Sequence, residues 1–249
     1  MLTAPWKEHV DAETGGVVYV MPDPEPTNAR VWFFTRKGGV SEPPYDSLNI
    51  STLVGDDDAA VLENRLRVEI AMGGRPSAWV RQVAGDRVVQ VDEAGFAGEG
   101  DALFTQKGGY ALVVAVADCV PVALVGEGVV GMVHSGWRGT LRGISGKAVR
   151  TMSGNVDGTV RAYIGPCIRR CCYEVSEELA GTFSDRFGPE VVSGRHLSLP
   201  DAIHIDLEKG GVSEVRDLGL CTGCRSDLFY SHRKQGLKTG RNLAAVALR

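Results

Sequence analysis

The sequence lacks an apolar run long enough to cross a membrane. Its longest apolar stretch, ALVVAVADCVPVALV, is broken by Asp118 and Pro121, whereas a membrane-spanning helix needs about 20 consecutive apolar residues. The N-terminus, MLTAPWKEHVDAE, lacks the basic segment followed by an apolar segment that is typical of a secretory signal peptide. We therefore expect a cytoplasmic protein with no membrane partner.

The sequence also lacks an excess of either charge. With 27 basic and 31 acidic residues, the formal net charge is −4 and the pI is about 5.8. Such a balance produces no positive field that would attract nucleic acid or an anionic membrane. We therefore expect small-molecule ligands and no nucleic-acid partner.

Cysteine is too sparse for a disulfide scaffold, with six in 249 residues, so free thiols are the default in a reducing compartment. Five of the six lie in two segments, IGPCIRRCCYEV and CTGC: Cys167, Cys171, Cys172, Cys221 and Cys224. A CxxC segment is a common half of a zinc site. The first segment has no matching CxxC, however, and its adjacent pair is awkward for one ion. A structural zinc site is therefore the less favoured alternative.

Length and glycine content favour one large mixed domain. A chain of 249 residues can bury a substantial core, and 32 glycines with 43% hydrophobic residues indicate many strands and turns. We predict an α/β (α+β) fold with a single domain over residues 29–249. Residues 1–28 form an N-terminal segment and a proline-rich connector, PDPEPTN. Strands grouped in hairpins argue against a purely parallel sheet.

Hydrophobic periodicity predicts the main elements. Strands are expected at residues 31–35, 78–83, 86–91, 111–125, 129–134, 160–165 and 242–248. Helices are expected at residues 59–72, 141–152, 177–187 and 212–218. In the first helix Leu62, Leu66 and Ile70 share one face, and Ser176 caps the third helix.

The hairpin after residue 118 can bring Cys119 and His134 together. A two-residue loop at positions 126 and 127 pairs Cys119 with His134, and a loop at 127 and 128 pairs Pro121 with His134 and leaves Cys119 on the same face. A three-residue loop places them on opposite faces. On one face they could bind a metal or form a thiolate–imidazole pair; ordinary packing is the alternative.

The segment SGWRGT follows His134 and leads into a helix. A glycine-rich helix start offers free N–H groups that suit an anion. Gly136 and Arg138 are therefore candidate anion-binding residues, and Trp137 offers a flat surface to a ring. In the alternative interpretation Thr140 caps the helix and Trp137 is a core residue.

Two further segments carry basic candidates. The loop TRKGGVS contains Arg36 and closes at Asn49, and the run SHRKQGLKTGR contains Arg233 and Arg241, which could hold phosphate. From the residues alone, a solvent-exposed loop is the favoured interpretation of both segments.

In combination, the motifs resemble the YfiH-like family, which is also labelled the laccase-domain or multicopper polyphenol oxidase family. They are TRKGGVS with SLN, GDD with ENR, RQV-x-G, DAL-x-T, ADCVP, HSGWRGT, IGPCI with CYEV, CT, and FYSHR with TGR. The resemblance runs from Thr35 to the C-terminus. It implies a four-layer α-β-β-α sandwich with mixed sheets. It also implies zinc-dependent phosphorolysis of adenosine, inosine or methylthioadenosine, together with adenosine deamination.

The resemblance implies that zinc is held by Cys119, by His134 and by a histidine at the position of Ala84. Alanine has no donor atom, and a catalytic zinc usually has three protein ligands. We therefore expect weak zinc binding and reduced activity. Asp118 is a candidate proton acceptor. The substrate pocket is expected to contain Arg36, Asn49, Gln82, Gly136, Trp137, Arg138, Arg233 and Arg241.

The oxidase label implies copper, which we consider the less favoured metal. Laccase-type copper sites need many imidazoles, commonly as His-x-His, whereas this chain has five histidines and no such pair. Two alternatives to the phosphorylase remain. One is an amide hydrolase on peptidoglycan precursors with Cys119 as nucleophile and His134 as base, as the resemblance to a bacterial member suggests. The other is an inactive nucleoside-binding module. We expect a monomer or a weak homodimer.

Overall fold

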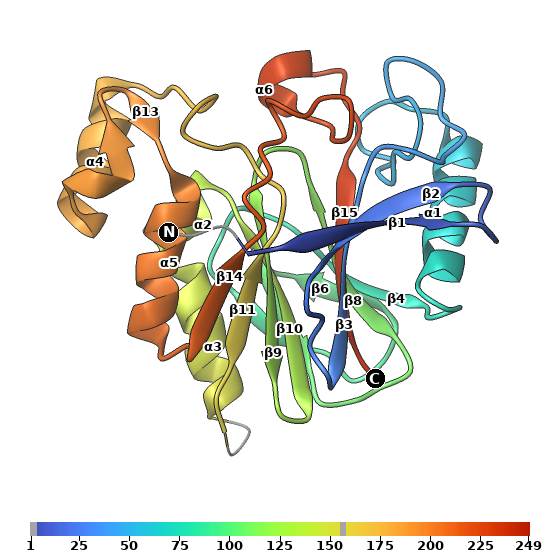
Figure 1. Ribbon diagram of the computed structural model, residues 1–249, viewed down its shortest axis with the longest axis horizontal. Coiled ribbons are helices and arrows are strands. Elements are labelled where there is room, and N and C mark those ends of the chain that lie inside the picture. Colours follow the sequence, from blue (N-terminus) through green and yellow to red (C-terminus); the bar gives the residue numbers. More distant parts are fainter. Residues whose placement is uncertain (1–3, 155–157) are drawn as a thin grey trace.

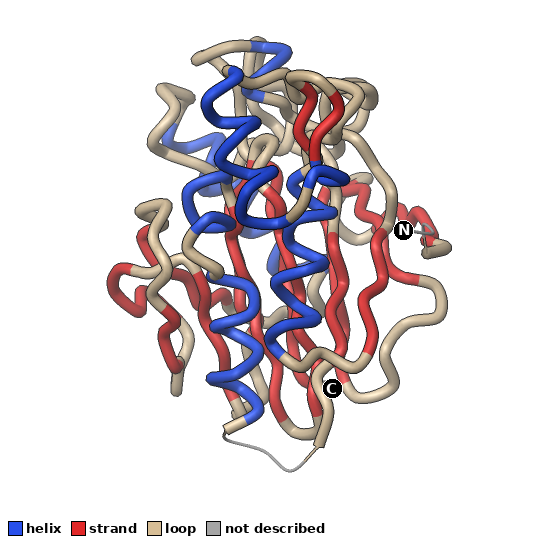
Figure 2. Tube along the Cα trace, turned by 90° about the vertical axis from the view of Figure 1, so that its left-hand side faces the viewer, coloured by secondary structure: helices blue, strands red, loops and turns tan. Residues whose placement is uncertain are grey.

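Two β-sheets pack face to face, and helices cover their outer faces (Figures 1 and 2). The computed structural model describes residues 4–154 and 158–249. One apolar cluster lies between the sheets, a second lies under the helices on one side, and a third lies under α1 on the other. This arrangement confirms the predicted α-β-β-α sandwich.

The larger sheet has seven strands in a mixed arrangement. In spatial order they are β1 (Trp6–Asp11), β2 (Val17–Pro22), β3 (Ala29–Phe34), β15 (Asn242–Leu248), β8 (Ala111–Val116), β4 (Ser77–Arg81) and β6 (Gly95–Glu99). Strand β4 is parallel to both neighbours, and the other pairs are antiparallel. Strands β1 and β2, which lie within the predicted N-terminal segment, thus pair in the same sheet as β3.

The smaller sheet has six strands and carries the candidate site. In spatial order they are β14 (Glu214–Asp217), β11 (Arg161–Ile164), β9 (Val120–Gly126), β10 (Val129–Ser135), β7 (Ala102–Thr105) and β5 (Val88–Gln90). The edge pairs β14–β11 and β5–β7 are parallel, and the inner pairs are antiparallel. A separate ribbon is formed by β12 (Val192–Ser193) and β13 (His196–Leu197).

The helices are α1 (Asp58–Ala71), α2 (Trp137–Leu141), α3 (Ile144–Ser153), α4 (Glu177–Phe187), α5 (Leu199–Gly210) and α6 (His232–Gln235), with a short 3-10 helix at Pro189–Val191. Residues of α3, α4 and α5 pack on the smaller sheet, and α1 packs on the larger one. The predicted cap of α4 is confirmed, since the Ser176 side chain accepts a hydrogen bond from the backbone of Leu179. No helix among the described residues is long and apolar enough to span a membrane.

Three element predictions and one alternative interpretation are wrong. The strand predicted over residues 111–125 is two strands, β8 and β9, which lie in different sheets. Residues 214–217 form strand β14 rather than a helix, because they pair in parallel with β11 at the sheet edge. The helix predicted over residues 141–152 is two helices, separated at Gly143, whose φ of 74° is left-handed. Thr140 lies inside α2 and caps nothing: Gly136 is the N-cap, and the Thr140 hydroxyl donates to its carbonyl oxygen.

The apolar face predicted for α1 points outward. Leu62 and Leu66 are 62% and 53% exposed, while Val61, Asn64 and Val68 face the sheet. The reason is polar: the buried amide of Asn64 donates to Ser41 Oγ and to the carbonyl oxygens of residues 47 and 49. These bonds fix the rotation of α1 about its axis so that Asn64 faces the sheet, although this leaves Leu62 and Leu66 exposed.

Candidate active site

The hairpin β9–β10 sets the position of His134. Pro121 lies opposite His134, and Gly126 lies opposite Val129, so the loop consists of residues 127 and 128. This register is the second of the two favourable alternatives. Cys119 lies in the bend just before β9 and is partly exposed. A β-carbon at Gly136 would lie only 3.0 Å from Cys119 Sγ, so the thiol lies against the start of α2.

A buried carboxylate holds the imidazole. Asp101 is completely buried, and its Oδ1 lies 2.8 Å from His134 Nδ1. The backbone N–H of His134 also donates to the Asp101 carbonyl oxygen, at 2.7 Å. With Nδ1 donating to the carboxylate, Nε2 is left for the thiol or for a metal. The sequence interpretation assigned no role to Asp101, although it begins the DAL-x-T motif.

The electrostatics of this pair favour its charged form. Burial alone lowers the pKa of His134, but the electrostatic influence of the neighbouring Cys119 sulfur and the hydrogen bonds to Asp101 and Cys119 outweigh it and raise the pKa to about 10. Burial also raises the pKa of Asp101, but the hydrogen bonds from His134 and from the backbone N–H groups of residues 83 and 85 hold it below its usual range. The surroundings of His134 therefore favour the protonated imidazole next to the ionised carboxylate.

The loop that carries Ala84 is attached to the same carboxylate. The backbone N–H groups of Val83, Ala84 and Gly85 donate to Asp101, at 3.2, 3.0 and 2.7 Å. Ala84 N and His134 Nδ1 share one oxygen, Oδ1, so position 84 lies beside the imidazole. Ala84 has a φ of 55°, a left-handed conformation that alanine rarely adopts and in which histidine is enriched.

Asp118 joins three segments of the chain. Its φ is 85°, its Oδ1 accepts from Thr222 Oγ1 at 2.6 Å, and its Oδ2 accepts from the backbone N–H of Arg233 at 2.7 Å. Its carbonyl oxygen accepts from the backbone of Ile168 at 3.0 Å. With both carboxylate oxygens engaged, Asp118 is better suited to positioning these loops than to accepting a proton.

A hollow of about 470 Å³ lies beside α2. Its lining includes Trp137, Tyr173, Arg195 and Arg233. The Arg233 guanidinium lies 5.1 Å from the centre of the Tyr173 ring and donates to the carbonyl oxygen of residue 174. The exposed Arg138 stacks on Trp137 at 4.3 Å. Two predicted substrate residues, Trp137 and Arg233, therefore meet here.

A second hollow, of about 750 Å³, lies between α1 and β4. Its lining includes Trp79, Gln82, Phe96 and Arg241. Burial lowers the pKa of Arg241, and the charges of Cys119 and Asp118 act in the opposite direction, so Arg241 belongs to the electrostatic surroundings of the site. The Gln82 amide is engaged with both backbone groups of Ala115, at 2.9 Å each.

Arg36 and Asn49 are engaged in holding loops. The Arg36 guanidinium donates to the carbonyl oxygens of Asp46 and Ser226 and lies 4.6 Å from the centre of the Tyr230 ring. Asn49 is completely buried, and its amide contacts residues 51 and 56 and the backbone N–H of residue 241. These contacts leave little of either side chain free for a substrate.

The donor set at this site is incomplete for a catalytic zinc. Cys119 and His134 supply a thiol and an imidazole nitrogen, both good zinc ligands, but Ala84 supplies nothing and a catalytic zinc usually has three protein ligands. Among residues 4–154 and 158–249, the only group of three or more potential metal ligands lies elsewhere, at Cys171, Cys172, Cys221 and Cys224. The residues present therefore do not fit a three-ligand zinc site, and no reaction step is assigned to a metal here.

A buried imidazole–carboxylate pair beside a thiol, at strand ends of an α-β-β-α sandwich, defines a candidate enzyme with a cysteine–histidine centre. The chain belongs to the family described as multi-copper polyphenol oxidoreductase laccase, whose model matches residues 30–249. The predicted family is thus confirmed.

The relatives agree on fold and length. The chain is 33% identical to "Purine nucleoside phosphorylase YlmD" of Geobacillus stearothermophilus, over 86% of this chain and 88% of the relative. It is 38% identical to "Purine nucleoside phosphorylase" of Deinococcus radiodurans, over 87% and 88%. The crystal structure of YlmD from Geobacillus stearothermophilus superposes with a TM-score of 0.87, at 30% identity, covering 98% of this chain and all of that chain.

Proposed function

We propose that this protein is a purine nucleoside phosphorylase. In this reaction an oxygen of inorganic phosphate bonds to C1′ of the ribose, the bond from C1′ to the purine nitrogen breaks, and the base leaves with a proton. The observation that carries the proposal is the buried Asp101–His134 pair beside Cys119. The names of the relatives support the same activity.

The residues around the centre suit these substrates. A flat purine can stack on the aromatic rings of Trp137 or Tyr173 in the smaller hollow. Arg233 borders the same hollow, and Arg241 lies within the electrostatic reach of Cys119 and Asp118, so both can attract phosphate. In its protonated form His134 can donate a hydrogen bond to the phosphate or to the departing base. We propose inosine, adenosine and methylthioadenosine as the nucleosides.

Adenosine deamination is the weaker part of the proposal. That reaction needs an activated water, which a fully ligated zinc would supply. With two protein donors instead of three, we propose that this chain binds zinc weakly at Cys119 and His134. Its deamination and its phosphorolysis should therefore both be low.

The test is the Ala84→His variant. We expect it to gain zinc at this centre and to accelerate inosine phosphorolysis by about 100-fold, because a missing ligand is restored. Metal content is measured together with release of hypoxanthine in phosphate buffer. Ala84→Gly is the matched control, since glycine tolerates the left-handed backbone but adds no donor. Equal rates in the natural chain and in both variants, with bound zinc unchanged, would contradict the proposed role of position 84.

A second function is favoured by one observation. Cys119, His134 and Asp101 together supply a thiol, an imidazole that can take up the proton of that thiol, and a carboxylate that orients the imidazole, which is the arrangement of a thiol hydrolase. Such a centre needs no metal and could cleave an amide in a peptidoglycan precursor. Iodoacetamide should then abolish amide hydrolysis while a chelator has no effect. Sensitivity to the chelator would exclude this mechanism, and nucleoside binding without turnover in all variants would indicate a binding module.

A further inference from the structure

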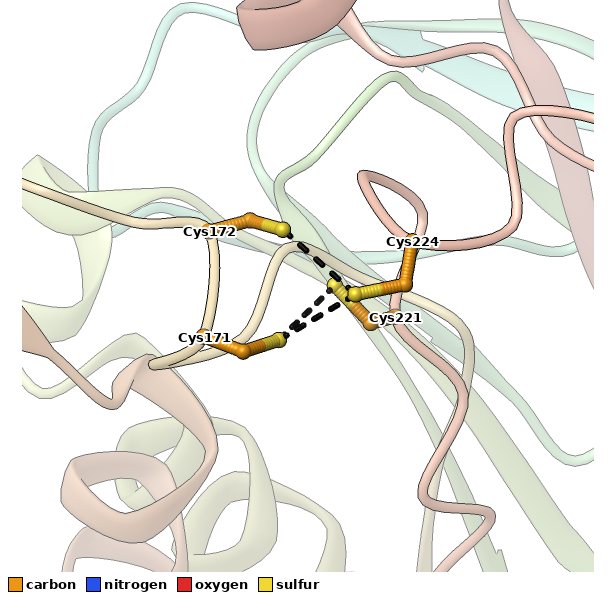
Figure 3. Close-up of side chains that lie close together, drawn as sticks. All are labelled: Cys171, Cys172, Cys221 and Cys224. Atoms are coloured by element: carbon orange, nitrogen blue, oxygen red, sulfur yellow. Dashed lines mark hydrogen bonds between the residues drawn. The ribbon is translucent and has the colours of Figure 1, made fainter.

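Four cysteines from two loops converge at one point near the protein surface. Cys171 and Cys172 follow β11, Cys221 and Cys224 follow β14, and the four side chains point toward one another (Figure 3). All four sulfur atoms lie within 4.8 Å of one another. The sulfur of Cys171 lies 3.5 Å from that of Cys221 and 3.4 Å from that of Cys224, and the sulfur of Cys172 lies 3.5 Å from that of Cys224.

These distances suit four ligands around one ion. A disulfide bond joins sulfur atoms at about 2.05 Å, much shorter than any contact in the cluster. Four thiolates at about 2.3 Å from a tetrahedral zinc are separated by about 3.8 Å along each edge. The observed contacts of 3.4 to 3.5 Å are close to this edge. Four sulfur donors within 4.8 Å of one another are the kind of ligand set that selects zinc over magnesium or calcium.

A tight backbone turn, which the sequence did not reveal, sets the positions of the adjacent Cys171 and Cys172. The N–H groups of Cys172 and Tyr173 both donate to the carbonyl oxygen of Arg169, at 2.8 and 2.9 Å. This tight turn directs Cys171 and Cys172 to the same point, so the objection that neighbouring cysteines are awkward for one ion does not apply. The sequence prediction disfavoured a zinc site here, and the structure corrects the geometric basis of that prediction.

The two loops are fastened together independently of any metal. Cys167 N–H donates to the Leu220 carbonyl oxygen at 3.2 Å, and Thr222 N–H donates to the Cys167 carbonyl oxygen at 3.0 Å. A β-carbon at Gly223 would lie 2.9 Å from the β-carbon of Cys172 and 3.0 Å from its sulfur. Glycine at this position therefore makes room for the close approach of Cys172.

We propose that these four cysteines bind one zinc ion as a closed tetrathiolate site. With four protein ligands the ion has no open position for substrate, so its role is structural. It ties the loop after β11 to the loop after β14. Thr222, which lies between Cys221 and Cys224 in the sequence, donates to Asp118. Tyr173, which directly follows Cys172, lines the smaller hollow. The zinc therefore also steadies two walls of the candidate active site.

The test measures metal without measuring activity. The full-length protein is expressed with zinc in the medium, purified with a reductant, and assayed for metal and for free thiols. We expect one tightly bound zinc per chain in the natural protein and in Cys119→Ser, and none in the double variant Cys171→Ser/Cys224→Ser. Cys167→Ser is the matched control, because Cys167 lies in the same loop but outside the cluster, and it should retain the zinc.

Cobalt substitution of the natural protein keeps the test decisive if the double variant does not fold. A tetrathiolate site gives intense thiolate-to-cobalt charge-transfer bands together with the visible bands of a tetrahedral ion, and one cobalt per chain should saturate them. The inference is overturned by a natural protein that carries no zinc and shows no thiolate–cobalt bands, by zinc that disappears in Cys119→Ser, or by a disulfide within the cluster of the reduced protein. None of these outcomes bears on phosphorolysis.

Discussion

The Cys119 region and the four-cysteine cluster differ in what they lack: the first lacks a metal donor, and the second is less buried. At Cys119 the support is complete: a buried carboxylate orients the imidazole and holds the neighbouring loop through three backbone hydrogen bonds. One donor is absent there. At the four-cysteine cluster the donors are complete, but two of the four side chains are exposed, and the buried Asp217 binds the Arg169 side chain rather than a cysteine. A site thus depends separately on its donors and on the residues that position them.

The difference follows from where each region lies in the fold. The Cys119 region lies at strand ends of the smaller sheet, where His134 and Asp101 are buried, so each polar group needs a partner. The cluster lies on loops beyond the strands, where the exposed Cys171 and Cys224 remain in contact with solvent. Binding of an ion would supply order that the apolar core does not provide there.

The largest effect is expected from Asp101→Asn, which removes the carboxylate that orients His134 in the Cys119 region. The amide cannot accept from His134 and from three backbone N–H groups together, so buried donors lose their partner. We expect a loss of about 3 kcal/mol in the free energy of unfolding and, in the Ala84→His background, a loss of about 100-fold in phosphorolysis. Urea denaturation and hypoxanthine release measure the two effects. Zinc at the four cysteines should be unchanged.

The pH dependence of the free energy of unfolding tests whether the ionised Asp101 carboxylate stabilises the fold. Because the pKa of Asp101 is lowered in the folded protein, its contribution is fully present above its unfolded pKa of about 3.9. It is lost as pH falls through the lower folded value. The natural protein should therefore lose more stability than Asp101→Asn as the pH falls below about 4. Parallel acid denaturation curves would show that Asp101 is not ionised in the fold.

Two glycine substitutions, one in each region, should have effects of intermediate size and should each affect only their own region. Gly136→Ala places a methyl group 3.0 Å from Cys119 Sγ, and Gly223→Ala places one 2.9 Å from the β-carbon of Cys172. We expect the first to lower phosphorolysis in the Ala84→His background about tenfold without affecting the cluster zinc. We expect the second to weaken zinc retention by the cluster about tenfold, while phosphorolysis falls by less than about twofold.

Gly181→Ala is the control for both glycine variants. A β-carbon at Gly181 meets no atom within 4 Å, and alanine in the interior of α4 should stabilise the helix slightly. Competition with a chromogenic zinc chelator measures the retention of zinc. If both Gly136→Ala and Gly223→Ala lowered activity and zinc retention to the same extent, the two regions would be one cooperative unit and the comparison would fail.

Local pattern predicted some parts of the site from the sequence. Alternation along the predicted hairpin put Cys119 and His134 on one side for either two-residue loop and on opposite sides for a three-residue loop, because successive side chains of a strand point to opposite faces. Whether the loop would contain two or three residues remained open, and the structure selected two. The family and the sandwich architecture were also predicted, because they rest on many short motifs spread over most of the chain.

The parts that escaped prediction depend on distant hydrogen bonds. Asp101 lies 33 residues before His134, and nothing local marks it as the residue that orients the imidazole. The adjacent cysteines looked unsuitable until the turn at Arg169 was known. In α1 the buried Asn64 outweighed the leucine stripe. In each case a tertiary polar contact, invisible to periodicity, decided the geometry.

The smallest predicted effect tests the link between the two regions. Thr222 lies between two of the cluster cysteines, is completely buried, and donates to Asp118 Oδ1 at 2.6 Å. Thr222→Val keeps the shape but removes the donor. We expect a cost of about 1 kcal/mol in the free energy of unfolding and, in the Ala84→His background, a reduction in phosphorolysis of about threefold. The reduction arises because Asp118 also holds the backbone of Arg233. Thr222→Ser should restore both values, and zinc at the cluster should be unaffected in either variant. If valine and serine behaved alike, the hydroxyl would not connect the regions, and the structural zinc would stabilise its own loops without reaching the active site.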